Sequence, residues 1–135
     1  MRKKKTTDHE VCPCGSGKIF LECCGPLLSL ELRATTAVEL MRSRFTAYAH
    51  KDVDYLVGTW APETCPGRTV LELDEGVKWL DLRILEVQDG GKQDERGVVR
   101  FGARFKRRGK AGKLIESSRF ERRGGEWIYV EGEIE

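Results

Sequence analysis

The residues best suited to chemistry are four cysteines in the stretch CPCGSGKIFLECCG, residues 12–25. Cys12 and Cys14 are separated by one residue, and after eight intervening residues Cys23 and Cys24 follow as an adjacent pair. Four thiolates can fill the four tetrahedral positions around a zinc ion, at about 2.3 Å each. A catalytic zinc keeps one position open, so a complete set of cysteines predicts one structural Zn²⁺ and no catalytic residue.

Two other uses of these cysteines stay open at this point. A thioredoxin-like redox motif needs a CxxC spacing after a strand, and this stretch has neither. An iron–sulfur cluster also takes four thiolates, but usually with wider spacing between neighbouring ligands. The spacing therefore favours zinc, and it does not by itself separate zinc from iron.

The residues around the cysteines predict a tight metal-binding knuckle. The glycines allow positive φ values and bring backbone amides close to sulfur. We expect Ser16 to cap a short helix over residues 18–24, Gly25 to end it in the left-handed conformation, and Pro26 to prevent its continuation. So short a segment has little core of its own, and structural zinc can supply about 10–16 kcal/mol toward its folding.

Composition indicates a folded, soluble protein of 135 residues, 39% of them hydrophobic and 34% charged. No run of about twenty apolar residues is present, so no membrane-spanning helix is expected. The basic N-terminus lacks the apolar segment of a signal peptide, which predicts a cytoplasmic location. In that reducing compartment, clustered cysteines bind metals more often than they form disulfides.

Three sections are predicted: a basic flexible tail (1–10), a zinc knuckle (11–28) and a body (34–135). In the body, Thr36 and Glu39 predict a capping box for a helix through residue 48, and Asp52 predicts the cap of a second helix. Alternating apolar residues then predict strands, with turns at 109–112 and 124–125 and strands over 80–84, 99–105, 114–122 and 127–130. Helices followed by an antiparallel meander predict an α+β domain with the helices on one face of a curved sheet.

The cysteine stretch resembles the SEC-C motif, the zinc-binding element of the bacterial translocase ATPase SecA. Its pattern CxCxSG, followed by CC or CH, matches the four cysteines, Ser16 and Gly17. The resemblance implies four metal ligands, a turn serine and a turn glycine. In SecA, lysines before the second cysteine pair meet the chaperone SecB. Here Ile19, Leu21 and Glu22 stand in most of those places, and we expect Ile19 and Leu21 to pack the knuckle against the body.

The remaining motifs resemble the uncharacterised bacterial YchJ family. They are LMRSRFTAYAHKDVDYLVGTW (40–60), ESSRF (116–120) and EWIYVEGE (126–133). The resemblance implies a nuclear-transport-factor-2-like (NTF2-like) body, in which helices close a cone-shaped pocket over a curved sheet. Relatives often read HExSRF where this chain has Ile115 before Glu116, and the missing histidine argues against a histidine-based reaction.

A second candidate site lies in the body. Glu116 and Ser118 share a strand face with apolar neighbours, and a buried carboxylate must be paired or neutral. Arg44, within the apolar stripe of the first helix, is the expected partner. This pair is either structural or part of a small-molecule pocket. The candidate pocket residues are Arg44, Tyr48, Trp60, Glu116, Ser118 and Trp127.

The other reactive residues give weaker evidence of a functional site. His9 and His50 lack evident acid, nucleophile or metal partners, and Cys65 has no activating base nearby in the sequence. Acidic residues dominate 72–95 and basic ones 96–113, which predicts neighbouring strands that neutralise each other. No nucleic-acid motif accompanies the basic run at 105–110, so nucleic acid is not the expected partner.

Taken together, these features predict a zinc-binding cytoplasmic bacterial protein that acts as an interaction or adaptor module, with a protein partner meeting the knuckle. The alternative is a small-molecule-binding protein or an enzyme that uses the cone pocket. Because no catalytic constellation is visible, binding is favoured over catalysis.

Overall fold

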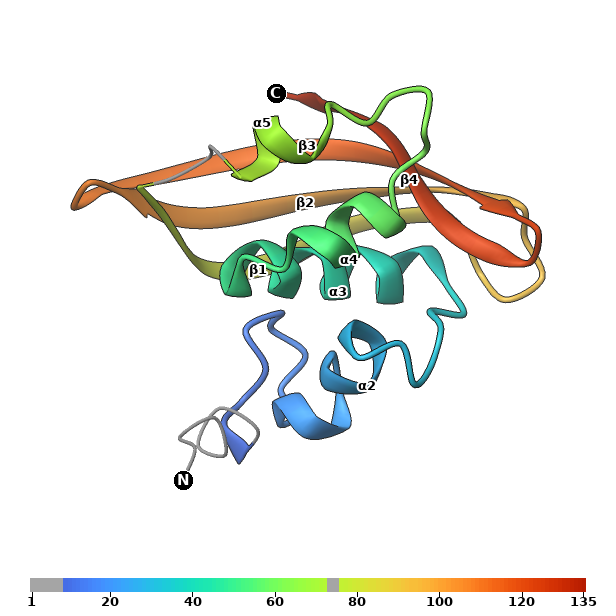
Figure 1. The fold of residues 1–135 in the computed structure, drawn as a ribbon, viewed down its shortest axis with the longest axis horizontal. Coiled ribbons are helices and arrows are strands. Elements are labelled where there is room, and N and C mark those ends of the chain that lie inside the picture. Colours follow the sequence, from blue (N-terminus) through green and yellow to red (C-terminus); the bar gives the residue numbers. More distant parts are fainter. Residues whose placement is uncertain (1–8, 73–75) are drawn as a thin grey trace.

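A four-stranded antiparallel sheet forms one layer of the molecule, and helices cover one of its faces (Figure 1). The structure is a computed structural model and describes residues 9–72 and 76–135. The strands follow one another in the order β1-β2-β3-β4. Their bounds are β1 (Val77–Asp89), β2 (Arg96–Arg107), β3 (Lys110–Arg123) and β4 (Glu126–Ile134). The predicted α+β fold is confirmed, with strands longer than the alternation indicated.

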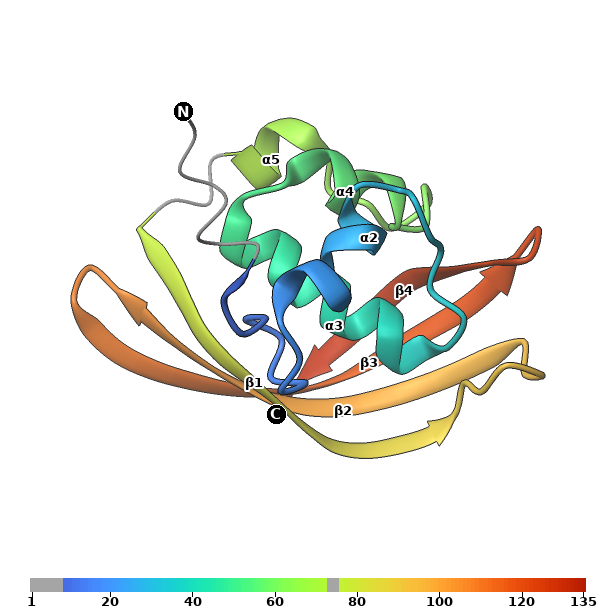
Figure 2. The same cartoon turned by 90° about the horizontal axis from the view of Figure 1, so that it is seen from below.

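Bulges and tight turns shape this sheet. The β1–β2 register shifts between Trp79 and Asp81 and again further along β1, and a third irregularity interrupts the β3–β4 pair. Such bulges bend a strand and increase its twist. Figure 2 shows the result, a curved layer with the helices on its concave side. Gly124 and Gly125 make the predicted turn, whereas the preceding turn is only Arg108 and Gly109, all four with positive φ.

The helices of the body are α3 (Ala37–His50), α4 (Val53–Gly58) and α5 (Arg68–Glu72), of which α5 was not predicted. The Thr36 hydroxyl accepts the Glu39 N–H, as expected of a cap. The Glu39 carboxylate, however, accepts the N–H of Thr35 and not that of Thr36, so the predicted capping box is displaced by one residue. The Asp52 carboxylate accepts the Tyr55 N–H and caps α4 as predicted.

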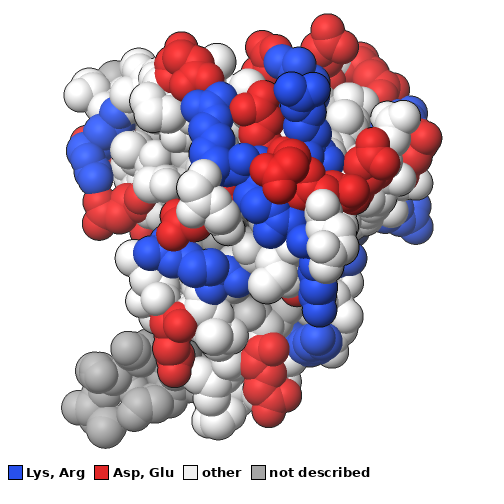
Figure 3. All heavy atoms as spheres, turned by 90° about the vertical axis from the view of Figure 1, so that its right-hand side faces the viewer, with Lys and Arg blue, Asp and Glu red and all other residues white. Residues whose placement is uncertain are grey.

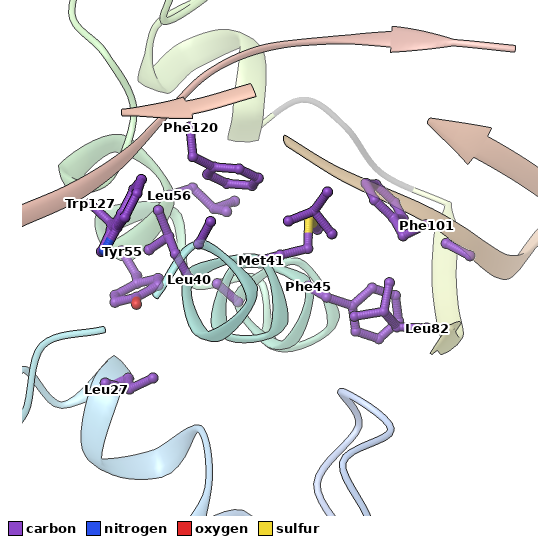
Figure 4. Close-up of a cluster of buried hydrophobic side chains, with 14 residues drawn as sticks. Leu27, Leu40, Met41, Phe45, Tyr55, Leu56, Leu82, Phe101, Phe120 and Trp127 are labelled. Carbon is purple, nitrogen blue, oxygen red and sulfur yellow. The ribbon is translucent and has the colours of Figure 1, made fainter. Parts of the chain in front are cut away.

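The main core lies between α3 and the concave face of the sheet. Leu40 on α3, Val99 on β2 and Phe120 on β3 are almost completely buried. In Figure 4, Met41 and other side chains of α3 point toward the sheet, whereas Leu27, on the short N-terminal helix, approaches α3 from the opposite side. The helix α3 is therefore the middle layer, between the sheet and the N-terminal residues.

The N-terminal module, residues 11–28, contains η1 (Phe20–Glu22) and α2 (Gly25–Leu28) and lies beside α3 (Figures 1 and 2). The predicted helix over 18–24 is present only as the short 3-10 helix η1. Gly25 and Pro26 begin a helix where they were expected to end one, because proline at the first helical turn gives up no hydrogen bond. A Cβ at Gly25 would lie 2.9 Å from the Phe20 carbonyl oxygen, so close contact, and not a left-handed turn, requires glycine.

Some charged side chains are paired across the outer face of the sheet. Asp81 on β1 forms an ion pair with Arg104 on β2, as predicted from the two oppositely charged segments. Arg100 on β2 pairs with Glu135 instead, and Lys78 faces Lys106, so the neutralisation is partial. Figure 3 shows basic and acidic side chains interleaved over the face that it draws. Among the helices of the described residues, none has the length and apolar character to cross a membrane.

Candidate metal centre and body cavity

The four cysteine sulfurs converge on one point. The Sγ atoms of Cys12, Cys14, Cys23 and Cys24 all lie within 4.8 Å of one another. Those of Cys14 and Cys23 are 3.5 Å apart, and those of Cys23 and Cys24 are 4.0 Å apart. Four sulfurs at the corners of a tetrahedron around zinc, with bonds of about 2.3 Å, would be separated by about 3.8 Å. The side chains therefore already have the spacing of a closed tetrahedral site for a single metal ion.

Backbone geometry between the two cysteine pairs produces this convergence. The Cys12 N–H donates to the Lys18 carbonyl, and Val11 and Ile19 form an antiparallel bridge, so the chain doubles back after the first pair. Gly15 lies inside this loop with φ +83°, a conformation that side chains rarely adopt. The turn that the glycines predicted is thus present.

Two hydroxyl groups contact the sulfurs. The Ser16 Oγ lies 3.1 Å from the Cys23 Sγ and accepts the Lys18 N–H, so its predicted role as a helix cap is wrong. The Thr46 Oγ1, on α3, lies 3.6 Å from the Cys12 Sγ. Hydroxyls placed this way can donate to metal-bound thiolates and orient them. Thr46 comes from the body, so the surroundings of the site are completed across the two regions.

Without a cation, it is unfavourable for all four clustered thiols to be ionised. Cys12, Cys14 and Cys24 are buried. Hydrogen bonds from the Cys12 and Cys24 thiols lower the pKa of Cys14, whereas the hydrogen bond with Cys12 raises the pKa of Cys24. Burial raises the pKa of Cys23 to about 11. One thiolate is stabilised by its neighbours at the expense of the rest, and a divalent cation would compensate all four.

The module is attached to the body by its backbone as well. The Arg42 Nη1 on α3 donates to the Cys14 carbonyl at 2.7 Å. A Cβ at Gly15 would lie 2.7 Å from the Leu82 carbonyl of β1, so the loop lies directly against that strand. The rings of Phe20 and His50 are 5.1 Å apart, which places the predicted lone histidine at this contact.

The expectation that Ile19 and Leu21 pack against the body is wrong for Leu21. Its side chain is 49% exposed, and Ile19 is only half-buried beside Val11. Leu27, on α2, joins the main core instead. The short helix that begins at Gly25 turns Leu27 toward α3, whereas Leu21 lies in η1, which has no buried residue.

The body contains a separate cavity of about 210 Å³ between α3 and the sheet. Of the candidate pocket residues, Arg44, Tyr48, Glu116 and Ser118 line it. Trp60 does not line the cavity but stacks against Arg44, whose guanidinium carbon lies 4.6 Å from the ring centroid.

Trp127 lies apart from this cavity. Its indole N–H donates to the Thr35 carbonyl, and Arg122 lies over its ring. The expected fold placed it near the pocket, but Trp127 pairs with Arg122, farther along the sheet than Tyr129, which does line the cavity.

The predicted ion pair between Arg44 and Glu116 is wrong. The Arg44 Nη1 donates to the Leu56 carbonyl at 3.0 Å and to the Thr59 Oγ1 at 2.7 Å. The Ser118 hydroxyl donates to the Glu116 Oε2 at 2.9 Å. Arg44 thus bonds to groups on and directly after α4, and Glu116 to a neighbour on β3, although both side chains line the same cavity.

Three residues that contact these sites were missed from the sequence: Thr46 beside Cys12, and Tyr129 and Gly132, which both lie against the Glu116 carboxylate. Thr46 falls one turn from Arg42 on α3, and only the docked module shows its importance. Tyr129 and Gly132 lie in EWIYVEGE, where strand alternation could have placed Tyr129 beside Glu116. Cys65 lies outside the cysteine cluster, and the exposed His9 is not among the grouped ligands of the described residues.

Comparison with known proteins places these features in a family. The family model "YchJ, middle NTF2-like domain" matches residues 36–132. The chain belongs to the YchJ family. A UPF0225 protein from Chromobacterium violaceum is 45% identical over 132 residues, covering 96% of this chain and 97% of that protein. A UPF0225 protein from Streptomyces coelicolor is 43% identical, covering 91% of this chain and 94% of its own length.

Two solved structures are similar over nearly the whole chain. The solution structure of a SEC-C motif-containing protein from Rhodopseudomonas palustris has a TM-score of 0.81 and 42% identity, covering 90% of this chain and 96% of its own. A crystal structure of such a protein from Psychrobacter arcticus has a TM-score of 0.79 at 22% identity, covering 93% and 83%, and shows the shared fold. This chain is thus a YchJ-family protein with an NTF2-like body and an N-terminal cysteine cluster suited to a metal ion.

Proposed function

We propose that the four cysteines bind one structural Zn²⁺, and that this ion fixes the N-terminal module onto α3 and β1. The observation that carries the proposal is the spacing of the sulfurs, all within 4.8 Å of one another. Four thiolates leave no position for water or substrate, which is typical of structural zinc. The hydroxyl of Thr46 beside Cys12 supports a role in joining module to body.

Zinc is favoured over iron by the size of the cluster. Iron–sulfur centres hold several irons and bridging sulfides within their thiolates, so their ligands must lie farther apart than those around a single ion. The Cys14 and Cys23 sulfurs, 3.5 Å apart, leave room for one ion only. A single iron in the same four thiolates remains the competing occupant, and metal analysis distinguishes the two.

Metal content of the purified protein tests this proposal. Elemental analysis should find about one zinc per chain, and the double variant Cys23→Ser, Cys24→Ser should lose it. Cys65→Ser is the matched control, because it removes a thiol outside the cluster and should keep full zinc content. A chain that carries iron, or a double variant with unchanged zinc, would overturn the proposal.

We further propose that the module presents a surface to a protein partner. Four large apolar side chains of the module and of the residues just after it are between 49% and 64% exposed: Val11, Leu21, Leu30 and Leu32. Single exposed leucines are ordinary, but several within one short segment support an interaction surface. The zinc ion would then act by holding that segment in a fixed shape.

Affinity capture compares three forms of the chain. A partner retained by the wild type should be lost with the double variant Leu21→Ser, Leu30→Ser. Val70→Ser is the control, because Val70 is similarly exposed but lies on α5 in the body. Partners that remain with the leucine variant would place the interaction elsewhere on the molecule.

A further inference from the structure

The cavity of the body holds two opposite charges that do not meet. Arg44 projects from α3 and Glu116 from β3, and both line the space of about 210 Å³. Arg44 is only 2% exposed, and its guanidinium forms no ion pair with any carboxylate among the described residues. A buried charge without a counter-charge is costly unless something else compensates it.

The acidic end of the cavity is built around Glu116. The hydroxyls of Ser118 and Tyr129 lie 2.9 Å and 3.4 Å from its Oε2. Within the described residues, no hydrogen bond is made to Oε1, so this oxygen can accept one from a ligand. A Cβ at Gly132 would lie 2.0 Å from Oε2. Glycine at this position therefore makes room for the carboxylate, and an alanine would displace it.

The basic end of the cavity is built around Arg44. Its guanidinium carbon lies 4.6 Å from the ring centroid of Trp60 and 4.5 Å from that of Tyr129, and such aromatic faces attract cations. Among the described residues, Nη1 alone of the Arg44 nitrogens donates a hydrogen bond, to the Leu56 carbonyl on α4 and to the hydroxyl of Thr59, which follows α4. In the described part of the chain, the N–H groups on Nε and Nη2 make no hydrogen bond, so they can donate to an anion.

Tyr129 separates the two charges. Arg44 lies against the face of its ring, while Glu116 lies beyond its hydroxyl at the far end. The intervening walls are apolar and include Met41, Phe101 and Leu114. A ligand that satisfies both ends must carry a positive and a negative group joined by a short apolar chain.

The size of the cavity limits the ligand further. Tyr48 and Trp79 line both this cavity and a larger depression of about 650 Å³ beside α5, so the two spaces are adjacent. The cavity has the volume of about seven waters at roughly 30 Å³ each. That is smaller than the usual pocket for a drug-sized ligand.

We propose that this cavity binds a small zwitterion of the ω-amino-acid class, with its carboxylate on Arg44 and its amine on Glu116. The bound molecule supplies a counter-charge to Arg44 and another to Glu116. Its methylene chain replaces water along the apolar walls. Binding involves no bond-making step and does not depend on the metal centre.

Titration with a series of defined probes tests the proposal on the full, metal-loaded chain. The probes are glycine, β-alanine, 4-aminobutyrate, 5-aminopentanoate and 6-aminohexanoate, with pentylamine and pentanoate as singly charged analogues. We expect one of the longer zwitterions to raise the melting temperature, and both singly charged analogues to bind at least tenfold more weakly. In NMR spectra, the indole signal of Trp79 should move, whereas that of the distant Trp127 should not.

Two variants make the result specific to the site. Glu116→Gln keeps the volume and removes the charge, and it should weaken binding of the zwitterion at least tenfold while leaving pentanoate binding unchanged. Glu131→Gln is the matched control, because Glu131 pairs with Arg119 in an exposed ion pair. Unchanged zinc content and NMR dispersion establish that each variant is folded.

Three outcomes would overturn the proposal. The first is that no zwitterion of the series binds the folded chain. The second is that a singly charged analogue binds as tightly as the zwitterion of the same length. The third is that Glu116→Gln and Glu131→Gln have the same effect. Any of them would assign Arg44 and Glu116 a purely structural role in the body.

Discussion

The N-terminal module and the body bury polar groups in opposite ways. In the module, the buried cluster consists of Cys12, Cys14 and Cys24, with Phe20 and Leu28 packed beside it. In the body, the buried cluster is an apolar layer between α3 and the sheet. One region places its reactive groups on a single point, and the other keeps Arg44 and Glu116 apart across a cavity.

This difference shows what each region needs in order to fold. The body buries enough apolar surface to be stable through the hydrophobic effect, which is the usual source of stability in domains of this size. The module has few apolar side chains of its own, and its thiols raise or lower one another's pKa. A metal ion can supply to the module what apolar burial supplies to the body.

Removal of the metal should have the largest effect, and it should be confined to the module. Structural zinc contributes on the order of 10–16 kcal/mol in isolated zinc-finger peptides. After chelation, we expect hydrogen exchange of residues 11–28 to become fast while amides of β2 and β3 stay protected. Hydrogen-exchange mass spectrometry of the loaded and chelated chain measures this. Simultaneous loss of protection in the sheet would show that the two regions unfold as one.

A clash at the contact between module and body should have the next largest effect. Alanine at a left-handed position costs roughly 1–2 kcal/mol, and both Gly15 (φ +83°) and Gly17 (φ +89°) lie there. A Cβ at Gly15 also meets the Leu82 carbonyl, which adds about 1–3 kcal/mol of overpacking. A Cβ at Gly17 meets nothing.

Chemical denaturation therefore separates the two causes. Gly15→Ala should lower the free energy of unfolding by more than Gly17→Ala, and the difference between them reports the contact with β1. Equal effects of the two substitutions would mean that the loop does not lie against β1 in solution.

Loss of the Thr46 hydroxyl should weaken metal binding without unfolding the body. Polar groups around metal ligands typically contribute 10- to 100-fold in affinity. Thr46→Val removes the group near the Cys12 sulfur and keeps the side-chain shape, whereas Thr46→Ser keeps the hydroxyl. Competition with a chromophoric chelator should show weaker zinc binding only for the valine variant. The same zinc affinity for both variants would mean that the Thr46 hydroxyl on α3 does not support the metal ligands.

The smallest effect belongs to an exposed ion pair of the body. The Arg123 guanidinium, hydrogen-bonded to Glu63, lowers the pKa of that carboxyl from its ordinary value near 4.5 to about 2. Because the folded-state pKa is lowered, the pair stabilises the fold above pH 4.5, and this contribution is lost as the pH falls toward 2.

Comparison of the wild type with Glu63→Gln tests this pH dependence. Thermal unfolding should show a slightly more stable wild type at pH 7 and no difference near pH 2. High salt should reduce the gap at pH 7, because the pair is exposed. A difference that grows on acidification would have the wrong sign for this pair.

Local signals in the sequence predicted many of these features correctly. The cysteine spacing indicated a metal cluster, Thr36 and Asp52 indicated the starts of two helices, and period-two alternation indicated the sheet. Each of these depends on residues within one turn or one strand. The bounds of the strands and the short helices α2 and α5 were not predicted, because packing against other elements extends or induces them.

Partner choice across the fold could not be read from the chain. Arg44 and Glu116 were expected to pair because both fall on apolar faces. In the structure, Arg44 instead donates hydrogen bonds to the Leu56 carbonyl and to Thr59. Glu116 accepts one from Ser118. Likewise, Gly25 was expected to end a helix, whereas contact with Phe20 is what requires a glycine there.

The α+β class and the set of four cysteines could be predicted from the chain alone, because strand alternation, helix caps and ligand spacing are properties of neighbouring residues. Only the tertiary structure decided that Thr46 lies beside Cys12 and that Gly132 makes room for Glu116. Those contacts join residues far apart in the chain. Their geometry depends on bulges, helix positions and the docking of the module, which no local pattern encodes.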